Sequence, residues 1–175
     1  MVRIWGYAMP DSETGALRKK ALSIAKALNA ITAADSDIKF TKETEDGRFR
    51  IQKTVYLLKR LGYPAAQKFD FNLYLMGPYS PDLTKCYYEL GDEGIRSAGI
   101  ASDLSHTKRD LVIHAIRKGD DFLEGLTALL DVYRQVNHLP AALANAKALK
   151  RHIGPGTWKE VREFLGANPG LIAPT

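Results

Sequence analysis

The spacing of apolar residues changes twice between Phe49 and Leu90, and this change constrains the fold more than any other feature of the sequence. In the first part, apolar residues recur every three or four positions, which predicts a helix. Its apolar stripe comprises Ile51, Val55, Leu57, Leu58 and Leu61. The polar residues expected to face solvent are Gln52, Lys53, Lys59 and Arg60. Gly62 and Pro64 end the helix, because glycine caps helices and proline cannot continue them.

The next segment alternates apolar and polar residues, which predicts a half-buried strand from Phe69 to Met76. The apolar face of this strand comprises Phe69, Phe71, Leu73 and Leu75. We expect Gly77 and Pro78 to stop the strand, because proline cannot donate a hydrogen bond to a ladder.

A second helix is predicted from Pro81 to Leu90. Ser80 suits its N-cap, and proline is favoured at the first helical position. The apolar face of this helix comprises Leu83, Cys86, Tyr87 and Leu90. Cys86 is therefore expected to be a small buried apolar residue and not a nucleophile.

The order helix, strand, helix favours a mainly α fold with a small β element. We expect residues 49–116 to form a winged-helix-like core within a single domain spanning the whole chain. Residues 1–48 precede this core as a basic, helical N-terminal segment. Residues 117–166 follow it as C-terminal helices, and residues 167–175 are expected to be a tail rich in proline and glycine.

Outside the core, apolar periodicity predicts several further helices, from Glu13 or Thr14 to Ala33, over Asp120–Val136, over Pro140–His152 and from Thr157 to Gly166. Residues 1–12 are expected to be an extended piece or a tail. Residues 34–48 and 91–105 are expected to be loops, because they are rich in turn-forming residues. Residues 103–116 fit a helix or a strand, because the apolar run from Leu111 contains β-branched side chains.

Composition limits the class of protein. The chain has 175 residues, of which 45% are hydrophobic and 26% are charged, so it has enough apolar residues for a globular core. No apolar run approaches the roughly 18–20 residues that a membrane span needs. The first residues do not resemble a signal peptide, and a single cysteine excludes an intrachain disulfide. We therefore expect a cytoplasmic protein with no membrane partner.

The net charge of +5 is concentrated near the amino terminus. Residues 1–62 contain 12 Lys and Arg against 7 Asp and Glu, whereas residues 63–175 contain 13 of each kind. A basic side of this sort fits contact with nucleic acid or with an acidic protein. The alternative is that the charge only keeps the chain soluble.

Residues with catalytic or metal-binding potential do not form a recognisable pattern. The four histidines, His106, His114, His138 and His152, lack the spacing of metal ligands. The adjacent acids Asp120 and Asp121 suit the positive end of a helix dipole. No nucleophile, base and orienting acid follow one another in a known order. We therefore expect a protein that is not an enzyme and holds no metal or cofactor.

Tyrosines gather in the central stretch, and they are Tyr56, Tyr74, Tyr79, Tyr87 and Tyr88. Tyrosine suits interfaces because it combines a flat apolar ring with a polar tip. The predicted binding site for protein or nucleic acid comprises Arg48, Arg50, Lys53, Tyr74 and Tyr79. For Tyr56 and Tyr87 we favour the alternative that they fill the edge of the core, with their hydroxyl groups reaching water.

Two segments carry a family resemblance. Residues 52–58 (QKTVYLL) and residues 71–83 (FNLYLMGPYSPDL) resemble YwgA-type uncharacterised prokaryotic proteins and, more distantly, the SocA/Panacea domain of antitoxin-like proteins. Thr54 departs from the pattern, which often has leucine there. The first resemblance implies no known activity, whereas the second implies that the protein binds a toxin as an antitoxin or chaperone does.

These observations favour a non-enzymatic regulatory or interaction protein of the antitoxin-like type, which binds a protein partner and has a basic amino-terminal side able to touch nucleic acid. The alternative is a winged-helix transcriptional regulator that reads a DNA sequence. An enzyme with a site assembled around Tyr79 is the third reading. The sequence specifies neither the partner nor the oligomeric state.

Overall fold

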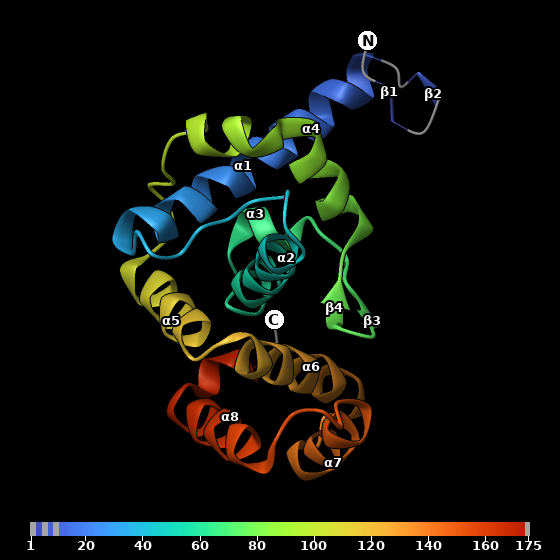
Figure 1. The fold of residues 1–175 in the computed structure, drawn as a ribbon, viewed down its shortest axis with the longest axis vertical. Coiled ribbons are helices and arrows are strands. Elements are labelled where there is room, and N and C mark those ends of the chain that lie inside the picture. Colours follow the sequence, from blue (N-terminus) through green and yellow to red (C-terminus); the bar gives the residue numbers. More distant parts are fainter. Residues whose placement is uncertain (1–2, 5–6, 9–10, 174–175) are drawn as a thin grey trace.

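The protein is mainly helical, with a small β element. The computed structural model describes residues 3–4, 7–8 and 11–173 (Figure 1). Its helices are α1 (Asp11–Ala34), α2 (Glu45–Arg60), α3 (Pro64–Gln67), α4 (Pro81–Ser97), α5 (His106–Arg117), α6 (Asp120–Val136), α7 (Leu139–Leu149), α8 (Pro155–Ala167) and the 3-10 helix η1 (Pro169–Leu171). Its strands are β1 (Arg3–Ile4), β2 (Tyr7–Ala8), β3 (Asn72–Tyr74) and β4 (Gly77–Tyr79).

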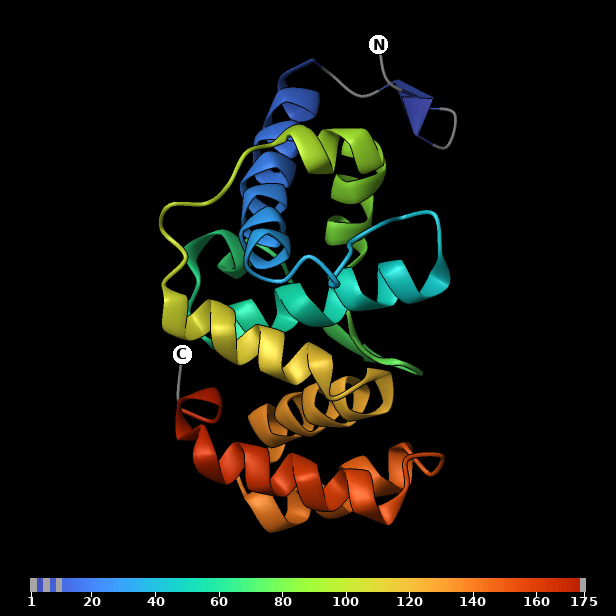
Figure 2. The same ribbon diagram turned by 60° about the vertical axis from the view of Figure 1, so that its left-hand side comes forward.

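The elements stack in layers around α2. Helices α1 and α4 pack together on one side of it, and α6 lies on the other side with α7 and α8 beyond it (Figures 1 and 2). The β3–β4 hairpin sits beside α2 and contacts α6. Every residue from Ile51 to Leu58 is buried, because other elements cover α2 on nearly all sides.

The prediction that four polar residues of α2 face solvent is wrong at three of the four positions. Gln52, Lys53 and Arg60 are buried, as is Thr54 beside them, and only Lys59 is half-buried. Periodicity identified an apolar face, on which Ile51 lies with residues of α1 and α4, but α6 and β4 also contact α2. The buried polar groups of Gln52, Lys53 and Arg60 are hydrogen-bonded within the protein, as burial requires.

Helix α2 begins earlier than predicted. Residues 34–48 were expected to be a loop, but the helix starts at Glu45, and the Thr44 hydroxyl accepts a hydrogen bond from the Gly47 N–H. Glu45 and Asp46 lie in the first turn, where negative charge complements the helix dipole. The error arose because this first turn is polar and shows no apolar period.

The predicted strand over residues 69–76 is a hairpin. Strand β3 pairs with β4 in antiparallel register, and Leu75 and Met76 form the turn between them. Gly77 has φ +84, a conformation that favours glycine, so it opens the second strand and does not stop the first. Pro78 is tolerated because both strands of a two-stranded sheet are edge strands. Phe71 is buried as expected, but Leu75 is 94% exposed.

Downstream helices follow the predicted periods, with shifted ends. Helix α4 was expected to end before Gly91 but resumes after a kink there, where φ is +64, and runs to Ser97. Residues 106–117 form a helix capped by Ser105, which resolves the choice between helix and strand. The caps predicted as Asp120 and Thr157 are Gly119 and Gly154.

The two ends of the chain differ in how far the predictions hold. Helix α1 is confirmed, and the predicted apolar face is buried at Ala21, Ile24, Leu28 and Ile31. Strands β1 and β2 pair with each other, while Trp5 lies outside the described residues. The segment expected to be a tail from residue 167 instead docks through Leu171, whose carbonyl oxygen accepts a hydrogen bond from Arg60 at 3.1 Å.

No helix between residues 11 and 173 combines the length and the hydropathy that crossing a bilayer requires. Cys86 is buried as predicted, and burial raises the pKa of its thiol to about 12.

Candidate functional site

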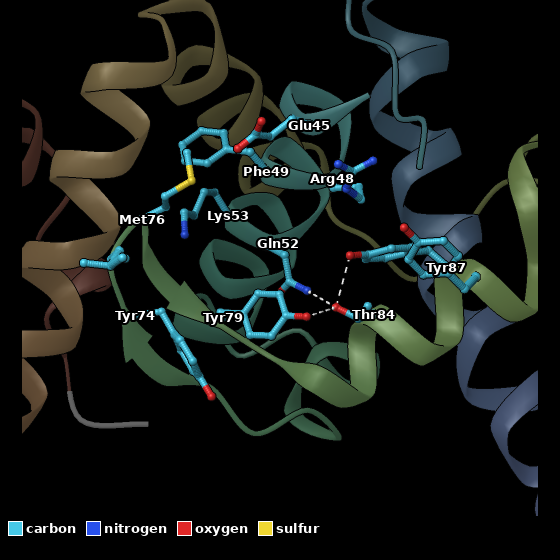
Figure 3. Close-up of a pocket in the computed structure, with 13 residues that line it drawn as sticks. Glu45, Arg48, Phe49, Gln52, Lys53, Tyr74, Met76, Tyr79, Thr84 and Tyr87 are labelled. Atoms are coloured by element: carbon cyan, nitrogen blue, oxygen red, sulfur yellow. Dashed lines mark hydrogen bonds between the residues drawn. The ribbon is translucent and has the colours of Figure 1, made fainter. Parts of the chain in front are cut away.

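A groove of about 740 Å³ opens between α2, the β3–β4 hairpin and α4 (Figure 3). We call it the tyrosine groove, because Tyr74, Tyr79, Tyr87 and Tyr88 line it. One face of α2 forms a wall, with side chains at the spacing of a helical stripe, namely Glu45, Arg48, Phe49, Gln52 and Lys53. Its size is within the range of known ligand sites.

Four of the five residues predicted to form a binding site line this groove. Arg48 and Lys53 come from α2, whereas Tyr74 and Tyr79 come from the hairpin. Arg50 points elsewhere, and its guanidinium makes two hydrogen bonds to the Asp120 carboxylate at 3.0 and 3.1 Å. The structure therefore brings together residues from two separate sequence segments.

Sequence reasoning missed several residues of the groove. Among them are Glu45, Phe49, Gln52, Met76 and Thr84, whereas Tyr87 and Tyr88 were noted only as part of the tyrosine cluster. The stripe from Glu45 to Lys53 has the spacing of one helical face and was detectable, had the start of α2 been placed correctly. The contribution of Met76 had no such signal, since it depends on the hairpin turn.

Gln52 joins the groove wall to the hairpin. Its amide group accepts a hydrogen bond from the Ser80 N–H at 2.9 Å and donates one to the Ser80 carbonyl oxygen at 3.0 Å. Lys53 beside it donates to the carbonyl oxygen of Pro78 at 2.9 Å. The two sequence motifs that carry the family resemblance, residues 52–58 and 71–83, are therefore hydrogen-bonded to each other. We call the Gln52–Ser80 pair the amide lock.

The Thr84 hydroxyl orients two of the tyrosines (Figure 3). It lies 2.8 Å from the Tyr79 hydroxyl, 3.0 Å from that of Tyr87 and 3.0 Å from the Gln52 amide nitrogen. Burial raises the pKa of Tyr87, and the hydrogen bonds partly oppose this. Tyr79 also meets Tyr74 edge to face, with ring centroids 5.2 Å apart. These contacts hold the rings in place without a ligand.

Tyr56 and Tyr87 are buried, as predicted, and their hydroxyl groups, which we expected to reach water, bond to partners within the protein. The Tyr56 hydroxyl donates to the Asp131 carboxylate at 3.3 Å, and that of Tyr87 pairs with Thr84. The reason is that α4 and α6 supply polar partners inside the protein, which the sequence alone does not reveal.

Two buried lysines donate hydrogen bonds to the backbone of the β3–β4 hairpin. Lys53 donates to Pro78, and Lys150 donates to the carbonyl oxygen of Leu75. Lys150 also pairs with the Glu124 carboxylate at 2.8 Å. We call Lys53, Glu124 and Lys150 the lysine clamp. It places the hairpin turn at a defined position beside α6.

Burial lowers the pKa of Lys53 to about 7. Desolvation disfavours the charged amine, and Lys150 adds repulsion, whereas Glu124 and Asp131 oppose the shift. Only 2% of Lys53 is exposed, and its Nζ atom lies 5.1 Å from the centroid of the Phe49 ring. The groove therefore contains an amine that gains or loses its proton near neutral pH.

This pKa predicts a specific dependence of stability on pH. Between pH 7 and 9 the unfolded chain keeps Lys53 protonated while the folded chain increasingly does not, so folding releases a proton and stability rises with pH. The free energy of unfolding of the wild type, minus that of Lys53→Met, should increase by about 2 kcal/mol over this interval. Urea unfolding at several pH values measures the difference. A difference that stays constant or falls contradicts the assignment.

The rim of the groove exposes large apolar side chains. Leu75 is 94% exposed, and Tyr74, Met76 and Tyr88 are 47–53% exposed. Three of them are consecutive at the hairpin turn. We call these four residues the apolar rim. Contiguous exposed apolar side chains of this kind mark interaction surfaces more often than isolated ones do.

Comparison with known proteins gives one informative match. The chain is 42% identical over 48 residues to the uncharacterised protein YwgA of Bacillus subtilis (strain 168), and this stretch covers 27% of the chain and 28% of YwgA. No known protein family and no solved structure matches the sequence. The similarity supports a YwgA-like relation over about a quarter of each chain.

Proposed function

We propose that this protein is a non-enzymatic interaction protein that binds a polypeptide partner in the tyrosine groove. The observation that carries the proposal is the apolar rim, in which Tyr74, Leu75, Met76 and Tyr88 stand exposed around a cavity. Aromatic and methionine side chains in such a position are typical of interface anchors. The partner would cover apolar surface that water otherwise contacts.

The internal contacts that fix the walls of the groove agree with this role. The amide lock and the lysine clamp hold its walls before any partner arrives. A preorganised surface loses little conformational freedom on binding, which favours affinity. The proposal needs no cofactor, and the resemblance to antitoxin-like proteins agrees with a cytoplasmic partner such as a toxin.

A DNA-binding winged helix is the second candidate, with the β3–β4 hairpin as its wing. It is favoured by the exposed cations of α1, Arg18, Lys19 and Lys26. Against it, the three cations predicted to touch nucleic acid have internal partners, because Arg48 donates to the Lys42 carbonyl oxygen, Arg50 pairs with Asp120 and Lys53 donates to Pro78. We therefore place this candidate below protein binding.

Capture of a partner by the full chain tests the proposal. Leu75→Ser should reduce the amount of the co-purified partner at least tenfold, because truncating a hot-spot residue typically costs about 2 kcal/mol or more and about 1.4 kcal/mol is tenfold in affinity. Leu149→Ser is the matched control, since Leu149 is also an exposed leucine, at 57%, but lies in α7 outside the groove. Quantitative mass spectrometry of the captured proteins gives the ratio.

Equal loss in both variants, or no protein whose capture depends on Leu75, would contradict the proposal. The DNA-binding candidate has its own test. Retention of duplex DNA with a steep salt dependence would support it, and absence of any shift at low salt would remove it.

A further inference from the structure

Lys53 has no carboxylate partner, although it is almost completely buried. Among residues 15–173 it forms no ion pair, and its Nζ atom donates to the carbonyl oxygen of Pro78 alone. An ammonium group has three N–H donors, so donor capacity remains. Lys53 lines the tyrosine groove, and Figure 3 shows its amine among the residues that enclose the cavity. The free donors are therefore available to a molecule in the groove.

The nearby acid is already engaged. Glu124 places one carboxylate oxygen 2.8 Å from the Nζ atom of Lys150 and the other 3.2 Å from the ring of His152. Asp131, the other acid of α6 that acts on Lys53, is bound by Tyr56 and by Arg134. A buried ammonium without a counterion is unfavourable, and an anion supplied from outside would relieve this.

Arg48 adds a second cation to the same wall. Its guanidinium donates to the carbonyl oxygen of Lys42 at 2.8 Å, an uncharged acceptor, and it forms no ion pair in the part of the chain that the structure describes. The groove lining thus contains two cations, Arg48 and Lys53, and a single acid, Glu45. Most of the remaining lining is aromatic or aliphatic.

We infer that the tyrosine groove binds an acidic, apolar segment of a polypeptide, whose carboxylate pairs with Lys53 and Arg48. The neighbouring apolar side chain of that segment would pack against Phe49, Met76 and Tyr74. Charge complementarity selects this partner over a basic segment, because a second cation beside Lys53 would be repelled. The inference rests on the proposed function and specifies the chemistry of its partner.

Binding of this kind should depend on pH. The protonated form of Lys53 accepts the carboxylate, and this form dominates below pH 7. The groups that face Lys53 are Glu124 and Asp131 of α6 and Lys150 after α7, and His152 adjoins Glu124. The pH dependence of the wild type is therefore compared with that of a variant lacking Lys53, in which these other groups are unchanged.

A random dodecapeptide library displayed on phage, selected on the immobilised full chain at pH 6, is the probe. We expect enriched peptides that place Asp or Glu beside Leu, Phe or Trp. A synthetic copy of the best peptide should bind at least tenfold more weakly when its acid is replaced by the amide, because a close charge pair is lost. Lys53→Met should weaken binding of the acidic peptide to the same degree. The affinity of this variant for the peptide should not rise between pH 8 and pH 6, whereas the affinity of the wild type should.

Two further variants keep the test decisive. Arg48→Gln removes the second cation from a half-buried position, so it remains informative if Lys53→Met does not fold. Lys159→Gln removes one charge from an exposed site of α8 and should bind like the wild type.

The outcomes separate this inference from the proposed function. Enriched peptides without acids, or unchanged affinity after amide replacement, would overturn the carboxylate site, while loss of binding in Leu75→Ser would still support the groove as the docking surface. Failure to enrich any peptide, or binding that survives both Leu75→Ser and Tyr74→Ser, would count against the inference and the proposed function together.

Discussion

Replacing Gln52 by leucine should lower the free energy of unfolding by about 2 kcal/mol, because the buried Ser80 N–H loses its partner. Leucine has a similar volume, so the change removes the amide lock with little loss of packing. The N–H of Ser80, a buried residue, would then be left unpaired at a cost of about 1–3 kcal/mol, whereas the Ser80 carbonyl oxygen would keep the Thr84 N–H at 3.1 Å as its donor. Urea unfolding of the full chain, monitored by circular dichroism, measures the effect.

The matched control is Gln67→Leu. Gln67 is exposed, and its amide donates a single hydrogen bond to the Lys59 carbonyl oxygen, so its replacement should change stability by less than about 1 kcal/mol. The loss of stability in Gln52→Glu should fall between those of the two leucine variants, since glutamate keeps an acceptor for the Ser80 N–H but loses the amide donor. If Gln52→Leu is no more destabilising than Gln67→Leu, the amide lock contributes nothing to stability.

Replacing Glu124 by glutamine should destabilise the protein by about 4 kcal/mol, because it leaves buried charge without a counterion. Lys150, of which 2% of the side chain is exposed, pairs with Glu124 at 2.8 Å, and Glu124 also attracts Lys53. Removing one member of a buried ion pair typically costs about 3–5 kcal/mol. The free energy of unfolding from urea titration at pH 7 measures the loss.

Glu160→Gln provides the comparison, since it makes the same chemical change in a more exposed pair with Lys118 at 2.9 Å and should cost no more than about 1 kcal/mol. The double variant Glu124→Met with Lys150→Met should recover part of the lost stability, because replacing both members of a buried pair by apolar groups is often neutral. Equal effects of Glu124→Gln and Glu160→Gln would show that the lysine clamp is not a buried ion pair.

Helices were predictable wherever apolar residues kept one period over several turns. This holds for α1, for α6 and for the start of α4, where Ser80 and Pro81 supply a local signal. Boundaries failed where the first turn is polar, as at Glu45, or where a glycine kink continues a helix, as at Gly91. Local sequence signals describe the backbone of one segment and not what packs against it.

The sequence predicted which residues form the candidate site better than it predicted their burial and their bonding partners. Tyr74, Tyr79, Arg48 and Lys53 meet in one groove, but Lys53 was expected to be a surface cation and is buried. Arg50 was expected beside them and instead pairs with Asp120, a contact across 70 positions of sequence. Pairings of this kind depend on the fold and have no local signal.

By itself, the sequence determined the helical periods, the change to a strand after Phe69 and the two motifs that carry the resemblance. Only the tertiary structure decided that these motifs bond to each other through Gln52 and Ser80 and that a groove forms beside them. The physical reason is that periodicity depends on near neighbours along the chain. Burial, ion pairing and the pKa of Lys53 depend instead on helices that arrive from distant positions.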